Sequence, residues 1–83
     1  MATLRFTPRA LRDIRKLPSG IRRDIELALD QLIEAPMSGS RLHGDWEGSR
    51  KLRSGDYRII YRIADGDVVV IQYVRHRREA YRK

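Results

Sequence analysis

The spacing of the apolar residues changes once along this chain, and the change limits the folds that it can adopt. Between residues 21 and 33 the apolar residues recur every three or four positions, the spacing of one helix face. From residue 50 onward, short β-rich runs are separated by turn residues, which is typical of strands. Helices followed by strands predict an α+β fold, with the helices on one face of an antiparallel sheet.

Two helices are expected in the first half of the chain. Thr7 and Pro8 form a helix start, because threonine caps free N–H groups and proline has no N–H to leave unpaired. The apolar side of this first helix consists of Ala10, Leu11, Ile14 and Leu17. Pro18 interrupts it, Ser19 is expected to cap the second helix, and Pro36 ends the second helix. The two form an αα-hairpin, and the apolar stripe of the second is Ile21, Ile25, Ala28, Leu29, Leu32 and Ile33.

Four strands are expected around this hairpin. Residues 3–7 alternate, with Leu4 and Phe6 on one face, and predict a short edge strand. Residues 50–54, 57–64 and 68–74 predict a three-stranded meander, with turns at residues 55–56 and 65–66. The helical hairpin must cover one face of the sheet, which leaves the other face free for a ligand.

The length and composition set limits on the class of protein. A chain of 83 residues has material for one modest core, so residues 1–83 are expected to form a single domain. The absence of cysteine excludes disulfides and thiolate metal sites. The longest apolar run, residues 68–71, is too short to span a membrane, and the first residues contain no apolar signal core. We therefore expect a cytoplasmic protein with no membrane partner.

The charge distribution gives the first indication of function. The formal net charge is +7, and arginine accounts for fifteen of the eighteen basic residues. Residues 1–45 contain eight basic and six acidic residues, whereas residues 46–83 contain ten and five. A localised positive field attracts phosphate polymers, and the planar guanidinium binds phosphate in a bidentate manner. An acidic protein partner would suit the same charge.

Several basic side chains are expected to share the free face of the sheet. Lys51 and Arg53 are two positions apart in the strand expected at residues 50–54, so both project from the same face of that strand. Arg58 and Arg62 are four positions apart in the strand expected at residues 57–64 and likewise share one face. The residues that follow this meander are Arg75, His76, Arg77, Arg78 and Tyr81. Together these groups could bind a phosphodiester and stabilise charge that develops on it. The alternative is surface pairing of the arginines with Asp56, Asp65, Asp67 and Glu79.

The remaining motifs narrow the chemistry. Metal-binding motifs are absent, His43 and His76 are the only histidines, and no glycine-rich nucleotide loop is present, so we expect no metal and no cofactor. The nuclease route that is left is attack of the ribose 2′-hydroxyl on the adjacent phosphate, which requires RNA. Trp46 precedes the first strand of the meander and is expected to pack against the core, with stacking on a base as the alternative.

The motifs also resemble those of a known family. The run from Lys51 to Ile63, KLRSGDYRIIYRI, is similar to the central strand pair of the RelE/ParE toxin superfamily, and HRREAYR at residues 76–82 resembles the tail of its RelE-like members. The helical hairpin, with Leu17-Pro18 at its turn, is similar as well. The resemblance implies the toxin of a type II toxin–antitoxin system, an endoribonuclease that cuts mRNA in the ribosomal A site and inhibits translation.

The resemblance also implies roles for individual residues. Lys51 and Arg58 match basic positions that hold the scissile phosphate, and Arg77 matches an arginine that stabilises the transition state. Tyr81 matches a tyrosine that stacks on a base and transfers a proton, and Arg53 is a further match. Where the family pattern has another lysine, this chain has Ser49.

Proton transfer has two candidates. Tyrosine ordinarily titrates near pH ~10, which suits a base at neutral pH poorly, whereas histidine titrates within the physiological range. His76 is therefore a candidate for general acid or base work, with a solvated or hydrogen-bonded histidine as the alternative. For Tyr81 the alternative to catalysis is an anchor that docks the tail on the sheet.

The resemblance implies partners as well. A RelB-like antitoxin would wrap the toxin through an acidic or amphipathic segment, and the complex would bind operator DNA through the antitoxin. Two other functions stay open: a ParE-like inhibitor of DNA gyrase, and a catalytically weak relative that only binds RNA or antitoxin. The tail that ends in Tyr81 favours the RelE-like alternative.

Overall fold

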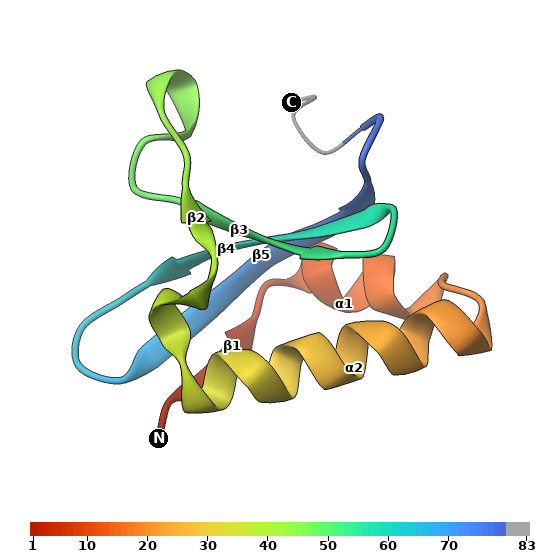
Figure 1. Cartoon of the computed structure of the whole chain (residues 1–83), viewed down its shortest axis with the longest axis horizontal. Coiled ribbons are helices and arrows are strands. Elements are labelled where there is room, and N and C mark those ends of the chain that lie inside the picture. The colour runs from red at the N-terminus through yellow and green to blue at the C-terminus, as the bar shows by residue number, and fades with distance from the viewer. Residues whose placement is uncertain (80–83) are drawn as a thin grey trace.

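A computed structural model describes residues 1–79 of the chain (Figure 1). Its elements follow in the order β1 (Thr3–Phe6), α1 (Pro8–Arg15), α2 (Ser19–Glu34), the 3-10 turn η1 (Pro36–Ser38), β2 (Ser40–Arg41), the 3-10 turn η2 (Gly44–Trp46), β3 (Arg50–Ser54), β4 (Tyr57–Ile63) and β5 (Val68–His76). The α+β class and the order of strand, helical hairpin and meander are therefore confirmed.

The strands form one sheet in the order β1-β5-β4-β3-β2. The meander β3-β4-β5 is antiparallel, as expected, and β1 joins the edge of β5 in parallel. Two details differ from the sequence expectation. Ser40 and Arg41 form the short strand β2 beside β3 where a loop was expected, and β5 continues past Val74 to His76.

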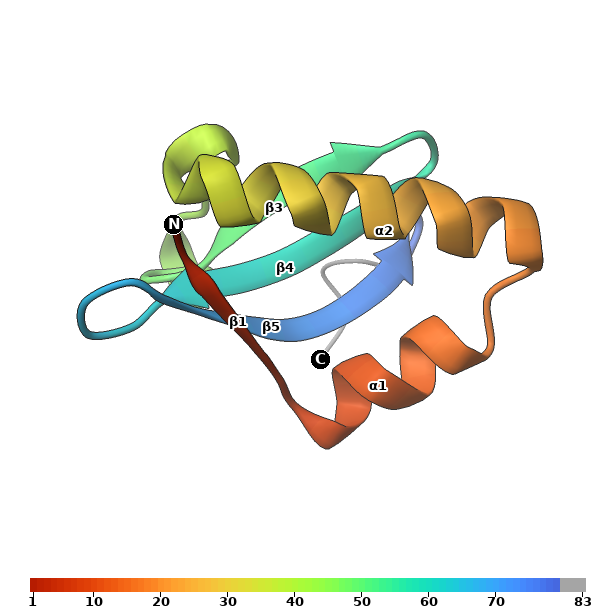
Figure 2. The ribbon, with the colours of Figure 1, turned by 90° about the horizontal axis from the view of Figure 1, so that it is seen from below.

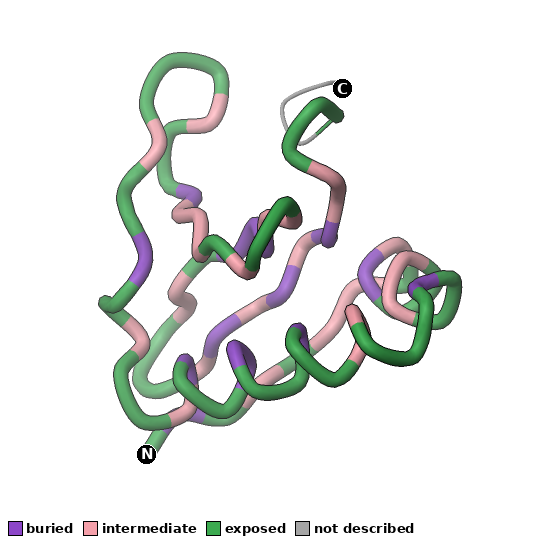
Figure 3. Tube along the Cα trace, turned by 45° about the vertical axis from the view of Figure 1, so that its right-hand side comes forward, coloured by how far each residue is buried: buried purple, intermediate pink, exposed green. Residues whose placement is uncertain are grey.

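Both helices lie on one side of the sheet (Figure 2). The buried residues of α2 are Ile25, Ala28, Leu29 and Leu32, which recur on the side that faces the sheet (Figure 3). They pack against core residues that alternate along the strands, among them Ile59, Tyr61 and Ile71. Four of the six residues of the apolar stripe that was expected for the second helix are therefore buried in the core, and Ile21 packs against it partly buried.

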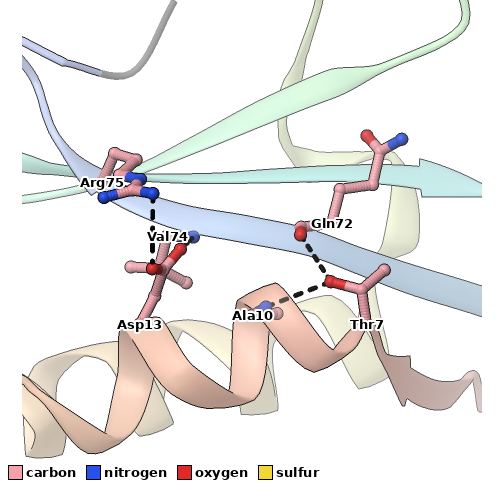
Figure 4. Close-up of polar contacts among 6 residues, drawn as sticks. All are labelled: Thr7, Ala10, Asp13, Gln72, Val74 and Arg75. Atoms are coloured by element: carbon pink, nitrogen blue, oxygen red, sulfur yellow. Dashed lines mark hydrogen bonds and ion pairs between the residues drawn. The ribbon is translucent and has the colours of Figure 1, made fainter. Parts of the chain in front are cut away.

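Helix α1 lies along the edge of β5 instead of flat across the sheet (Figure 4). The Thr7 side chain accepts from the N–H of Ala10, as expected for a cap, and its hydroxyl donates to the Gln72 carbonyl at 2.6 Å. Asp13, one turn further along than Ala10, accepts from the N–H of Val74 at 3.1 Å. These side chains pair with β5 beyond the point where β1 ends, so that α1 protects an otherwise open strand edge.

Two local expectations for the helices were wrong. Leu11 is 43% exposed, because a helix at the sheet edge buries a narrower strip than one that lies across the face. Ser19 is the first residue of α2 and does not cap it. At this turn the Arg22 guanidinium instead donates to the carbonyls of Arg15 and Leu17. No helix within residues 1–79 has the length and apolar character needed to cross a membrane.

Gly39 follows η1, after the end of α2, and lies in tight contact with the sheet. A Cβ built on Gly39 would lie 2.3 Å from the Lys51 carbonyl oxygen and 2.6 Å from the Tyr61 hydroxyl. That hydroxyl accepts from the Gly39 N–H at 3.0 Å and donates to the Pro36 carbonyl at 2.8 Å. Only glycine therefore fits at this position, between η1 and β2 and against β3 and β4, without a shift of the backbone.

We expect Gly39→Ala to lower the free energy of unfolding by about 1–3 kcal/mol, since overpacking here moves backbone as well as a buried tyrosine. Gly20→Ala is the matched control, because nothing lies within 4 Å of a Cβ at that helical position. It should stabilise the chain by about 0.4–1 kcal/mol. Urea unfolding followed by circular dichroism measures both, and equal stability of the two variants would contradict the packing argument.

Candidate functional site

The sheet face opposite the helices has a basic row at its centre. Arg58 on β4 lies directly opposite Arg53 on β3 and Arg75 on β5. Directly opposed residues of neighbouring strands share one face, and strands lie about 4.8 Å apart, so three arginines follow one another over about 10 Å. We call Arg53, Arg58 and Arg75 the arginine row. Adjacent like charges are unfavourable for folding, which favours an anionic ligand as the reason for this arrangement.

A second row runs beside the arginine row. Lys51 on β3 is opposite Ile60 on β4, and Ile60 is opposite Tyr73 on β5. The structure thus places Lys51, Arg53 and Arg58 on one face, as the alternation in the sequence predicts. Arg62 is exposed and lies two residues beyond Ile60 on β4. The side chains that belong to the helical core come from the intervening positions, such as Ile59 and Tyr61.

Arg58 is oriented by the turn that precedes it. Its Nη1 donates to the carbonyls of Gly55 at 3.1 Å and Tyr57 at 3.0 Å. Gly55 has a φ of +58°, which glycine adopts without strain, and this turn carries those carbonyls toward Arg58. A guanidinium held in this way loses little further freedom when it binds a phosphate.

Surface ion pairs engage two of the expected arginines. The Arg75 Nη2 lies 3.7 Å from the Asp13 Oδ1 (Figure 4), and the Arg77 Nε lies 3.9 Å from the Asp56 Oδ1. Of the four acids named as alternative partners, Asp56 thus pairs with an arginine, whereas Asp13 on α1 was missed. An exposed pair such as Arg77–Asp56 contributes about 0–1 kcal/mol, so that a phosphate can displace its carboxylate, whereas the Asp13 side chain is only 10% exposed and also accepts from the Val74 N–H.

The structure does not bring His76 together with the basic face. His76 is opposite Tyr57, and the two rings meet edge to face with centroids 5.5 Å apart. Tyr57 packs against the helical core, so the directly opposed His76 is on the helical side of the sheet, in a hollow that Leu17 also lines. The β5 strand has one extra residue at Gln72, which shifts its alternation so that Val74 and His76 face the helices while Tyr73 and Arg75 face away. The His76 Nδ1 accepts from the Arg78 N–H at 3.3 Å.

The remaining tail residues are less informative. Arg77 donates its backbone N–H to the Asp56 carbonyl at 2.7 Å, and the side chains of Arg77 and Arg78 are exposed. Tyr81 lies outside the described residues. Within residues 1–79, no three histidine, cysteine, aspartate or glutamate side chains form a group that could hold a metal ion.

An aromatic group on the open face was missed by sequence reasoning. Tyr73 is only 3% exposed, with the Trp46 ring centroid 5.7 Å away and the Arg9 Cζ 4.3 Å above its ring. The expectation that Trp46 packs is thus confirmed, although its partner lies outside the helical core. The register shifts between Ile60 and Tyr61, so β5 has one extra residue at Gln72, and no pattern in the sequence indicates this bulge.

Ser49 lies next to this group. It is 8% exposed, and its hydroxyl donates to the Gln72 Oε1 at 2.8 Å. A small buried serine therefore occupies the position where the family resemblance leads one to expect lysine. The bulge at Gln72 supplies its hydrogen-bond partner.

Comparison with known proteins identifies the family. Residues 4–81 match the family described as the ParE toxin of the type II toxin–antitoxin system parDE. Toxin RelG of Mycobacterium tuberculosis is 40% identical to the chain over 98% of it and 97% of the relative. The mRNA interferase toxin RelE of Escherichia coli is 38% identical over 81% of the chain and 73% of the relative.

Solved structures agree with these relatives. A RelBE toxin–antitoxin complex from M. tuberculosis matches with a TM-score of 0.82 and 40% identity, over 90% of this chain and 96% of that one. The isolated E. coli RelE toxin matches with a TM-score of 0.77 and 32% identity, over 92% and 84%. Family, sequence relatives and fold agree over nearly the whole length. The chain therefore belongs to the ParE toxin family of type II toxin–antitoxin systems and, within it, to the RelE-like toxins.

Proposed function

We propose that this toxin is an endoribonuclease that cleaves mRNA on the ribosome, in the A site, and so inhibits translation. The observation that carries the proposal is the arginine row beside Lys51, on the face that the helices leave open. Relatives 38% identical to the chain, from E. coli and Shigella flexneri, are named mRNA interferases, which supports the same activity here. The cytoplasm is the compartment in which this substrate is found.

The proposed reaction uses the ribose itself as nucleophile. The 2′-oxygen attacks the adjacent phosphorus and loses its proton to a base, the bond from phosphorus to the 5′-oxygen breaks, and an acid protonates that oxygen. The products are a 2′,3′-cyclic phosphate and a 5′-hydroxyl. Charge builds on the phosphoryl oxygens during this step, and preorganised cations stabilise it more strongly than water does.

Residues of the open face and of the tail are assigned to these tasks. Lys51 and Arg58 are assigned to the scissile phosphate, since they lie on adjacent strands and Arg58 is already oriented by the turn. Arg77 is assigned to the transition state, with Asp56 as its partner in the free toxin. Arg53, Arg62, Arg75 and Arg78 would bind flanking phosphates. We assign proton transfer to Tyr81, because His76 faces the helical side of the sheet.

The proposed partner of the toxin is a RelB-like antitoxin. Two of the similar solved structures are RelBE toxin–antitoxin complexes, one from M. tuberculosis and one from E. coli. They support the proposal that this chain also binds an antitoxin. An acidic or amphipathic segment that covers the basic face would prevent entry of RNA, because the same cations would be engaged. Operator DNA would be bound through the antitoxin of the complex.

The reaction is tested with a programmed ribosome and a single turnover of toxin. We expect a 2′-deoxy substitution at the cleaved nucleotide to abolish cleavage, because the nucleophile is removed, while binding persists. We also expect phosphorothioate substitution at the scissile phosphate to slow cleavage without rescue by Mn²⁺ or Cd²⁺, because protein cations stabilise the charge.

Two results would contradict the proposal. Cleavage of the 2′-deoxy substrate would show that the 2′-hydroxyl is not the nucleophile. Rescue of phosphorothioate cleavage by Mn²⁺ or Cd²⁺ would show that a metal ion, and not the protein cations, stabilises the charge on the phosphate. A chain that leaves mRNA intact but inhibits supercoiling by DNA gyrase would instead act as a ParE-like inhibitor.

A further inference from the structure

Part of the open face is buried although α1 and α2 lie on the other side of the sheet (Figure 1). Ile60 is 0% exposed and Tyr73 3% exposed, yet neither belongs to the core that the helices form with the sheet. Trp46 and Arg9 contact the Tyr73 ring from different elements, the first from η2 and the second from α1. This face therefore contains a small packed layer of its own, with a guanidinium at its surface.

Arg9 reaches this layer because α1 is fixed to the edge of β5. Thr7 binds the Gln72 carbonyl at 2.6 Å, and Asp13 binds the Val74 N–H at 3.1 Å (Figure 4). Arg9 lies between these two attachments on α1, and Tyr73 lies between their two partners on β5. The position of Arg9 beside Tyr73 is thus determined at both ends by hydrogen bonds to the strand.

The Arg9 guanidinium is available to an anion. Within residues 1–79 it makes no ion pair, and the nearby Asp13 carboxylate is engaged by Val74 and Arg75. A cation over the face of an aromatic ring is held by the ring quadrupole and keeps its charge, and a guanidinium there retains N–H donors for a phosphate. The contact with Tyr73 therefore positions the Arg9 cation without neutralising it.

We propose that Arg9 is a phosphate-binding residue of the toxin, which holds a phosphate flanking the scissile one on the β5 side of the open face. Tyr73 belongs to the row that crosses Ile60 to Lys51, so Arg9 and Lys51 lie at opposite ends of that row. The two strands are about 10 Å apart, which favours contacts with different phosphates of one RNA strand. Tyr73 and Trp46 act as positioning residues for Arg9. The inference rests on the proposed ribonuclease function.

The test measures RNA binding rather than cleavage. The full chain is titrated into a short single-stranded RNA with 2′-O-methyl groups throughout, which cannot be cleaved, and Kd is determined by fluorescence anisotropy at several salt concentrations. Each phosphate contact contributes about 0.7 to the slope of log Kd against log salt for a single strand. We expect Arg9→Ala to weaken binding about three- to tenfold at low salt and to lower the slope by about 0.7.

Two variants make the result specific. Arg23→Ala removes the same charge from an exposed position of α2, on the helical side, and should leave the slope unchanged. Arg9→Lys keeps the charge and should restore the slope. A slope for Arg9→Ala equal to that for Arg23→Ala would overturn the role of Arg9 alone. A parent chain whose RNA binding is absent or independent of salt would overturn the proposed function itself.

Discussion

Replacing Arg58 by alanine is expected to slow single-turnover cleavage of mRNA by about 10²- to 10³-fold. Loss of one preorganised donor to a developing oxyanion has an effect of this size. Arg58 lies in the middle of the arginine row and is held by the carbonyls of Gly55 and Tyr57. The measurement is the cleavage rate on a programmed ribosome, with saturating toxin to separate chemistry from binding.

The stability of the variant decides how the result is interpreted. Arg58 donates to two carbonyls of a surface turn, so we expect Arg58→Ala to lower the free energy of unfolding by less than about 1 kcal/mol. Arg58→Lys should recover part of the rate, because the charge returns without the bidentate fork. An unfolded Arg58→Ala chain, or a folded one with the parent rate, would remove Arg58 from the proposed site.

The same assay distinguishes a role of Arg77 in cleavage from a role limited to its ion pair with Asp56. The Arg77 Nε is 3.9 Å from the Asp56 Oδ1, and both side chains are more than half exposed. If Arg77 acts only as the partner of Asp56, then Asp56→Ala and Arg77→Ala would have equal effects. Under our proposal the Arg77→Ala variant cleaves mRNA slowly, whereas the Asp56→Ala variant cleaves it at the parent rate.

Tyr81→Phe and His76→Gln are expected to differ widely in cleavage rate. General acid or base catalysis contributes about 10²- to 10⁴-fold, so loss of the Tyr81 hydroxyl should slow cleavage within that range while RNA binding persists. His76 stacks edge to face on Tyr57 on the helical side of the sheet, so His76→Gln should keep the rate within about threefold of the parent.

A third variant separates stacking from proton transfer. If Tyr81 only stacks on a base, Tyr81→Phe would be nearly normal and Tyr81→Ala defective, because phenylalanine keeps the ring. If the His76→Gln variant cleaved slowly and its rate depended less on pH than that of the parent, His76 would be the residue that transfers the proton. Normal rates in both Tyr81→Phe and His76→Gln would leave neither residue with a role in proton transfer.

The local elements of this fold could be predicted because each depends on nearby residues. Thr7 and Pro8 start α1, and the apolar stripe that includes Ile25 and Leu32 forms α2. The turns around Gly55 and Gly66 separate the strands of the meander, since both glycines adopt positive φ. Alternation along β3 and β4 then placed Lys51 and Arg58 on one face, because side chains of a strand alternate wherever its register is regular.

Other features depend on contacts between distant segments, and only the tertiary structure decided them. The extra residue of β5 at Gln72 changes the alternation of that strand, so that Tyr73 faces away from the helices and His76 faces toward them. The position of α1 along the edge of β5 comes from hydrogen bonds between residues more than sixty positions apart in the chain, and it carries Arg9 to the open face. Sequence periodicity describes one segment at a time, whereas a bulge and a helix at a strand edge are set by the segments packed against them.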